Sequence, residues 1–460
     1  MRNACDQWRQ KCIMLCKMIR KRRSLLIWGM ACVPAWAQSP LSLNEAVERA
    51  LSKHPSIAAA QSGIDASDAR VRQAQSGRLP KVNYSESWQR SNNPVFVFSS
   101  LLSQRQFSES NFAIGSLNNP SALNNFQSVV SIDQPIYDAG LTKQATAGAQ
   151  LGRELATEDK RKAEQQSIGR VAAAYYGVLL AADMGQVADA AVLSAESDLQ
   201  RATNVRDAGM STDADVLSIR VHLAAMREQQ IRRRADLSVA EAALNEAMGE
   251  PLDNHFVLTT RLTMPAPAPN AASGVITRPE IRQAQLAGQI AENQATTARS
   301  AYLPQVFARA AFEADRQRFV TRAGANWFTG VTLRWNLFNG FADRARIEEA
   351  SSAVTRAHAQ ERQATEGVKL EIRRAQADMD AAGQRIAVAE SAVAQAEESL
   401  RITKNRYEAG LTTVTELLRN ESALAEVQFR RFAAIHDQRL AGVALEFAMG
   451  TLNQNSEVLK

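Results

Sequence analysis

The sequence predicts a mainly α-helical chain with four β-strands, built from two tandem repeats with long antiparallel coiled-coil helices. Two observations lead to this fold class. Short motifs recur at fixed offsets along the 460 residues, and proline is absent from two very long stretches, between Pro135 and Pro251 and after Pro304. Because proline interrupts a helix, these stretches predict helices much longer than those of most globular domains.

The repeat is clearest where the long helices are expected to end. The triplet DAG at 207–209 matches EAG at 408–410, and AMG at 247–249 recurs at 448–450, both 201 residues later. Each copy therefore predicts the same plan, which is a helix, two short strands, a very long helix, a tight turn and a returning helix.

Nearer the start of each copy the offset is larger. The motif LPxV at 79–82 recurs at 303–306, which is 224 residues later. The first copy thus carries about 23 extra residues, and they fall in the Ser- and Asn-rich stretch 91–125, where we expect a long loop. The predicted domains are a first repeat at 38–264, a proline-rich linker at 265–276 and a second repeat at 277–460.

The first 37 residues are expected to be a signal peptide. A basic cluster at 20–23 precedes an apolar run, and Ala35-Trp36-Ala37 fits a cleavage site. Removing 1–37 takes away all four cysteines and leaves 46 basic and 47 acidic residues, a formal charge of −1. The positive charge of the whole chain therefore does not indicate a nucleic-acid partner, and an exported chain without cysteine has no disulfide.

Heptad patterns run through both long helices. Large residues recur every seven positions in the second copy, and a mostly alanine series lies four residues earlier, which favours close coiled-coil packing. Subtracting the offset of 201 finds the same phase in the first copy. The large series of the second copy is Ile372, Met379, Ile386, Val393 and Leu400, and that of the first is Val171, Val178, Gly185, Val192 and Leu199.

Four segments alternate between apolar and polar residues, which is typical of strands with one apolar face. They are about 81–90, 126–134, 305–315 and 326–336. Each has roughly the 9–11 residues of a tilted strand that crosses a bilayer. A soluble sandwich with one buried face is the alternative.

Tryptophan residues mark the apolar faces of these segments. Trp327 and Trp335 lie eight residues apart on one face, about 26 Å along a strand, which is close to the spacing of two aromatic girdles in a membrane barrel. Trp88 lies on the corresponding face of the first segment. We therefore expect the apolar faces to contact outer-membrane lipid.

Four strands cannot enclose a channel, and the open edges of a sheet are not tolerated in lipid. An eight-stranded barrel, as a dimer would give, is filled by its own side chains. Three chains would give twelve strands with an open lumen, so we expect an obligate homotrimer with a 12-stranded β-barrel.

The order of these elements, their duplication and the opening motifs LSLxxA at 41–46 and HPxI at 54–57 resemble the TolC family of outer-membrane efflux proteins. The resemblance covers nearly the whole chain after residue 37. It implies a trimeric outer-membrane barrel continued by a helical tunnel through the periplasm. It also implies two partners, a periplasmic adaptor (membrane fusion) protein and an inner-membrane pump, and no cofactor.

The turns that join the long helices are the candidate functional sites. Gly209 and Gly410 fit the left-handed residue that ends a helix. Thr212 with Asp215 and Thr413 with Glu416 both have the spacing of a capping box. Helix capping alone is therefore one interpretation of these carboxylates.

The resemblance gives the second interpretation, in which the turns close the periplasmic mouth. It places a closing contact on Asp215 with Tyr407 and an acidic ring on Glu416. Thr412 stands where some members have an arginine, which implies a weaker closure. The family's adaptor-docking region maps onto Gly209, Met210, Gly410 and Leu411.

The sequence contains no G-x-S-x-G, P-loop, H-E-x-x-H or G-x-G-x-x-G motif, and its five histidines are scattered. We therefore expect neither an enzyme nor a metal site. The expected function is a passive outer-membrane conduit of a tripartite efflux system, gated at the turns. The alternatives are an outer-membrane channel for type I protein secretion and a soluble periplasmic coiled-coil scaffold.

Overall fold

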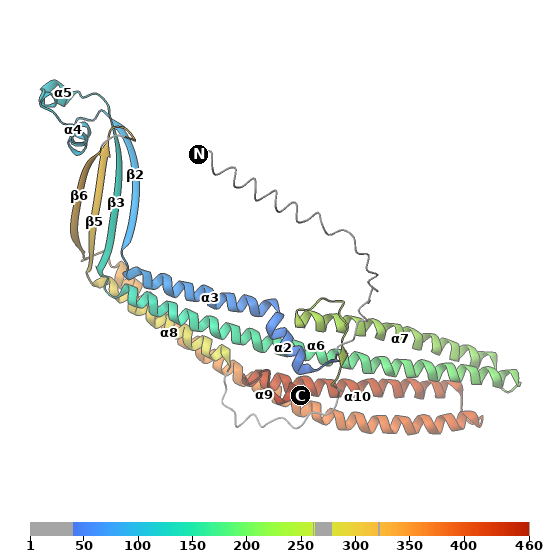
Figure 1. The fold of residues 1–460 in the computed structure, drawn as a ribbon. Helices are drawn as coiled ribbons and strands as arrows, with labels where there is room; N and C mark the ends of the chain where they lie inside the picture. The colour runs from blue at the N-terminus through green and yellow to red at the C-terminus, as the bar shows by residue number, and fades with distance from the viewer. Residues whose placement is uncertain (1–39, 261, 263–277, 321–322, 460) are drawn as a thin grey trace, which may run out of the picture. The chain divides into compact units, whose positions relative to one another are not determined.

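The computed structural model describes residues 40–260, 262, 278–320 and 323–459. The expected signal peptide at 1–37 and the expected linker at 265–276 lie outside the described residues. The described helices and strands follow the chain in the predicted order (Figure 1).

The described α-helices reproduce the duplicated plan. α6 and α9 each have 67 residues, α7 and α10 each have 36, and α3 and α8 each have 21. The predicted fold class, mainly helical with two copies of one plan, is confirmed. The helices are α2 (Leu43–Lys53), α3 (Pro55–Gln75), α4 (Pro94–Ser103), α5 (Ile114–Asn118), α6 (Leu141–Asp207), α7 (Asp213–Met248), α8 (Pro279–Arg299), α9 (Ala342–Glu408) and α10 (Val414–Met449).

The long helices form two antiparallel hairpins, α6 with α7 and α9 with α10, and α6 also packs along α10 (Figure 1). The predicted heptad seams lie in these contacts. Val178 and Val192 are buried in α6, as are Met379 and Ile386 in α9, and the alanine series packs beside them. The period of seven in the sequence therefore sets the faces along which the hairpins close.

The largest apolar core lies where α2, α6, α7 and α10 meet. Tyr175 and Tyr176 of α6 are fully buried there. The Tyr175 hydroxyl donates to the carbonyl of Leu41 at 2.9 Å, and the Tyr176 hydroxyl donates to the carbonyl of Val458 at 3.0 Å. These two bonds tie both ends of the described chain to the centre of α6.

The four predicted strands pair in one antiparallel sheet of order β2-β3-β5-β6. Their ends lie within three residues of the predictions. The strands are β2 (Lys81–Ser91), β3 (Leu123–Tyr137), β5 (Gln305–Arg316) and β6 (Gly324–Arg334); the two-residue strands β1 (Pro40–Leu41) and β4 (Val257–Leu258) pair separately.

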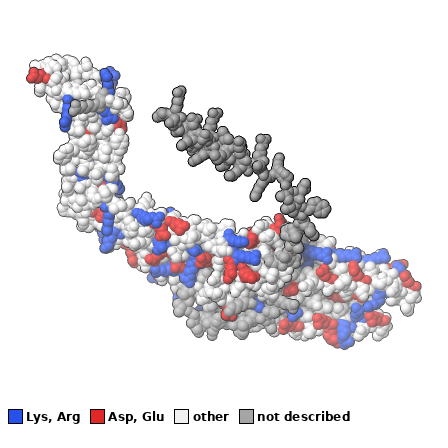
Figure 2. Space-filling model, viewed as in Figure 1, with Lys and Arg blue, Asp and Glu red and all other residues white. Residues whose placement is uncertain are grey.

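The register separates the sheet into an apolar and a polar face. Val82 lies opposite Ile132, and Phe312 lies opposite Trp327, on the apolar face. Charged groups cluster on the helical part of the described chain, while the sheet surface seen in Figure 2 is mostly uncharged. Two-sided alternation of this kind suits a wall with lipid on one side and water on the other.

The stretch 91–125 departs from the prediction of a long loop. It contains α4, α5 and a short 3₁₀ helix (Glu109–Phe112). Asn93 caps α4, accepting hydrogen bonds from the backbone of Val95 and Phe96, and Pro94 occupies the first turn. The loop prediction is wrong because the Ser- and Asn-rich average of the stretch concealed an apolar ten-residue run.

This insert folds onto the polar face of the sheet. The buried Gln104 amide donates to Asn125 Oδ1 at 2.8 Å, and Asn125 donates to Asp315 Oδ1 at 2.7 Å. Gly324 lies so close to the insert that a Cβ there would come 1.9 Å from the carbonyl oxygen of Ser103. The insert therefore covers the end of the sheet that is distant from α6.

Candidate functional site

The first turn, between α6 and α7, is shaped by the backbone conformation of Gly209. Its φ is +77°, and no atom lies within 4 Å of the position a Cβ would take. The Met210 amide donates to the carbonyl of Val205 at 3.0 Å, which closes the end of α6. The glycine is thus required by its left-handed conformation and not by lack of space.

Asp215 and Thr212 form the predicted capping box at the start of α7. The Asp215 amide donates to Thr212 Oγ1 at 3.2 Å, and the Thr212 amide donates to Asp215 Oδ2 at 3.3 Å. The hydroxyls of Ser211 and Thr212 donate to the same carboxylate oxygen. Hydrogen bonds from Thr212 are the main reason that the pKa of Asp215 lies below its ordinary value.

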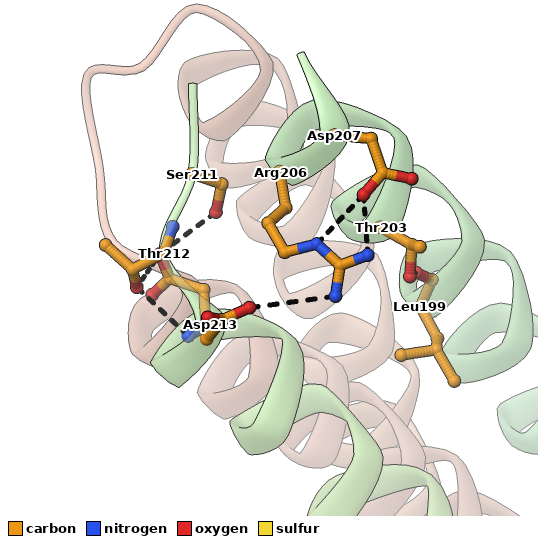
Figure 3. A network of polar contacts seen from close by, with 8 residues as sticks. Leu199, Thr203, Arg206, Asp207, Ser211, Thr212 and Asp213 are labelled. Atoms are coloured by element: carbon orange, nitrogen blue, oxygen red, sulfur yellow. Dashed lines mark hydrogen bonds and ion pairs between the residues drawn. The ribbon is translucent and has the colours of Figure 1, made fainter. Parts of the chain in front are cut away.

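Arg206 completes the polar network of this turn. Figure 3 shows its guanidinium between the carboxylates of Asp207 and Asp213, at 2.5 Å and 3.7 Å. Both carboxylates are exposed, so these ion pairs contribute little to stability. They leave the first turn with charges of both signs at its surface.

The second turn, between α9 and α10, repeats the backbone but not the whole cap. Gly410 has φ +70°, and the Leu411 amide donates to the carbonyl of Arg406 at 2.8 Å. Thr413 Oγ1 accepts from the Glu416 amide at 3.4 Å. The Glu416 carboxylate makes no return bond in the described chain, so the predicted second capping box is only half formed.

The end of the bundle presents apolar side chains beside the two glycines. Met210 is 75% exposed and Leu411 is 68% exposed. Glu416 is exposed as well, whereas Thr412 is half-buried. These predicted docking and gate residues therefore lie together on the turns, accessible to a partner.

Tyr407 lies between the two hairpins. It packs beside an apolar cluster of both hairpins that includes Ala202, Val216 and Val414. Burial raises the pKa of Tyr407, and the nearby Asp215 carboxylate raises it further. The Asp215 carboxylate is thus near enough to influence Tyr407, although no hydrogen bond joins the predicted pair in the described chain.

Ionic contacts across the hairpins were missed by the sequence analysis. Arg201 of α6 binds Glu408 of α9 at 2.8 Å. Ser194 of α6 donates to Glu421 of α10 at 3.0 Å, and His222 of α7 lies 3.4 Å from the same carboxylate. The heptads identify each seam, but they carry no signal for which flanking charges meet across two hairpins.

The sheet and hairpins together define a class of fold, in which one four-stranded antiparallel sheet is combined with two long helical hairpins. The sequence comparisons give the family. A sequence model of the family described as "Outer membrane efflux protein" matches residues 46–250 and 275–451, and the chain belongs to this family. It is a family of channels and not of enzymes.

Relatives and solved structures agree with this family. The chain is 25% identical to protein CyaE of Bordetella pertussis, over 92% of this chain and 87% of that protein. It is 22% identical to the alkaline protease secretion protein AprF of Pseudomonas aeruginosa, over 72% of this chain and 70% of that protein. The fold is similar to the CmeC outer membrane channel of Campylobacter jejuni, with a TM-score of 0.76 and 16% identity, covering 90% and 87% of the two chains.

Proposed function

We propose that this protein is the outer-membrane channel of a tripartite export system. Three copies would combine their four-stranded sheets into a barrel of twelve strands, and the helical hairpins would continue the path into the periplasm. The observation that carries this proposal is the sheet itself, which has one apolar face and ends in two edge strands, β2 and β6, that pair on one side only within the described residues. Such edges require neighbours in lipid.

The polar face of the sheet supports a water-filled lumen. Asn83 donates to Asp133 at 3.3 Å, and Arg309 lies 3.6 Å from Asp133. On the opposite face Trp88, Trp327 and Trp335 are 61%, 76% and 55% exposed. We propose that these three indoles form the aromatic girdle at the lipid interfaces.

The proposed gate lies at the turns. Tyr407 and Asp215 would close the periplasmic mouth, Glu416 would form an acidic ring that attracts cations, and Thr412 would weaken the closure. Opening would separate the two hairpins, which breaks cross-hairpin contacts such as Arg201–Glu408. The channel is passive in this proposal, and an inner-membrane pump supplies the energy.

The exposed turn surface of Gly209, Met210, Gly410 and Leu411 is proposed to dock the periplasmic adaptor. Small and apolar residues there allow close approach of helical tips and favour burial on binding.

Residues 1–37 would act as the signal peptide that sends the chain to the outer membrane.

Membrane fractionation and planar-bilayer recording test the channel. A barrel stays in the outer membrane after a high-salt wash and conducts ions as a trimer, whereas a periplasmic scaffold washes off and does not conduct. Recovery of the protein as a soluble monomer would refute the proposal.

The gate assignment has a separate test. In the double variant Asp215→Ala, Tyr407→Phe we expect higher conductance, because the closing contact is lost. Glu397→Gln, which changes an exposed carboxylate along α9, is the matched control. Conductance equal to that of the wild type in the double variant would reject the assignment.

Protein secretion is the second candidate, supported by the similarity to the secretion protein AprF. The two candidates differ in cargo and not in fold. Deleting the gene and measuring both the retention of a small dye and the proteins lost from the culture medium distinguishes them. Loss of secreted protein with unchanged dye retention would favour secretion.

A further inference from the structure

Behind the two turns, four helices enclose an acid pair that neither the caps nor the proposed gate uses. Asp198 of α6 has a side chain only 2% exposed, and Glu421 of α10 has one 9% exposed. In the described chain neither Asp198 oxygen receives a hydrogen bond. A buried carboxylate without a donor is unfavourable, so this pair calls for a further ligand.

Nearby cations do not fill this role. Arg201 of α6 and Lys404 of α9 lie 3.6 Å and 4.0 Å from Asp198 Oδ1, beyond hydrogen-bonding distance, and Arg201 is already bound to Glu408. Glu421 is better supplied than Asp198, because Ser194 donates to it and His222 of α7 lies beside it. Asp198 is therefore the carboxylate of the pair that lacks a hydrogen-bond donor.

The electrostatics of the two acids differ accordingly. Burial, and then the neighbouring Glu421, raise the pKa of Asp198 to about 7. Burial also raises the pKa of Glu421, but hydrogen bonds from His222, Asp198 and Ser194 outweigh it and the pKa ends below its ordinary value. A small cavity of about 140 Å³, lined by Ser194 and His222 among others, adjoins Glu421. A protonated Asp198 can donate to an ionised Glu421, which satisfies both groups.

We propose that Asp198 and Glu421 bind one proton between them, and that this shared proton holds the first hairpin to the second near the turns. The inference rests on the proposed function, in which separation of the hairpins opens the channel. Loss of the proton leaves two negative charges facing each other in a buried space, and their repulsion favours the separated hairpins.

The sign of the pH effect follows from the two states. With the hairpins together Asp198 holds its proton up to pH about 7, whereas a hydrated aspartate holds it only to about 4. The proton therefore stabilises the closed arrangement most at low pH. This stabilisation falls as the pH rises from about 4 to about 7 and is level above that.

Conductance of the trimer in planar bilayers between pH 5 and pH 8 tests the inference. We expect the wild-type conductance to rise by about threefold or more up to pH 7 and then to level off. Asp198→Asn keeps a neutral donor beside Glu421, so it should hold the low value throughout. Glu397→Gln, which changes an exposed carboxylate of α9 away from the pair, should keep the wild-type profile.

Infrared difference spectra report the proton independently of conduction. The wild type should lose the band of a protonated carboxyl group with a midpoint near pH 7, and Asp198→Asn should lack this band. Absence of the band from the wild type, or a wild-type conductance profile in Asp198→Asn, would overturn the inference. A titrating band in a protein that conducts at no pH would refute the conduit and the coupling to gating, but not the shared proton.

Discussion

The two repeats have the same backbone plan, but their long helices pack against different numbers of neighbouring helices. α6 and α9 have equal lengths, yet α6 packs against α2, α3, α7, α8 and α10, whereas α9 packs mainly against α8 and α10. The positions of Tyr175 and Tyr176 in α6 correspond to Gln376 and Ala377 in α9. Duplication therefore fixed the length and phase of the helices, and position in the bundle then decided which copy carries the core.

Because α9 has fewer neighbours, part of its apolar surface is exposed. It carries large apolar residues, Leu370, Val388 and Ile402, which are 69%, 70% and 46% exposed. In the proposed trimer a neighbouring subunit would cover them. The hairpin of the first repeat carries exposed apolar residues too, such as Val221 and Val239 of α7, so both repeats offer surfaces that a neighbouring subunit would cover.

The largest expected effect is a difference in stability loss between equivalent positions of α6 and α9. Tyr175→Ala should lower the free energy of unfolding by about 3–5 kcal/mol, because it removes a fully buried ring and the bond to Leu41. Gln376→Ala at the equivalent place should change it by less than about 0.5 kcal/mol. Denaturant titrations of the detergent-solubilised protein measure both, and equal losses would contradict the comparison.

The second-largest expected effect concerns the connection between the strands, because the first repeat carries the insert and the second has a short connection. Gly324→Ala should detach the insert from the sheet, at a cost of about 1–3 kcal/mol, because the new Cβ overlaps Ser103. Gly330→Ala in the same strand meets no atom within 4 Å and is the control. Limited proteolysis of the insert should accelerate in the first variant only. Equal cleavage rates would show that the insert is not held by this contact.

The caps of the two turns predict a smaller difference. Asp215→Ala should destabilise the first turn of α7 by about 1 kcal/mol, since it breaks a complete capping box. Glu416→Ala should change the start of α10 by less than about 0.5 kcal/mol. Hydrogen exchange of the backbone amides in each first turn measures the two effects. A larger loss of amide protection for Glu416→Ala than for Asp215→Ala would contradict the assignment of the complete capping box to the first turn.

The smallest expected effect is a pH dependence at the first turn. Because hydrogen bonds lower the pKa of Asp215 in the folded chain, its stabilising effect is complete above the unfolded value of about 3.9 and is lost as the pH falls through the lower folded value. Protection of the α7 amides should decline in that acidic window. Asp215→Asn should remove the decline, and an unchanged decline would assign it to another group.

Much of the fold could be predicted because its signals are local. Both long hairpins, their glycine turns and all four strands follow from periods and motifs within single segments, as Gly209 and the alternation from Lys81 show. The prediction failed for α4, where a ten-residue segment with seven apolar residues lies within a stretch that is Ser- and Asn-rich on average. It also overstated the second capping box, since spacing alone does not show where the Glu416 side chain points.

The sequence by itself determined the duplicated plan, the membrane-like strands and the position of the turns, because periodicity and capping act between residues close together in the chain. Only the tertiary structure decided that Asp198 and Glu421 are buried among the same helices and that Tyr407 packs against the apolar cluster of both hairpins. Such contacts depend on the rotation and stagger of one hairpin against the other. Many small packing energies set these quantities together, and no single segment of sequence contains them.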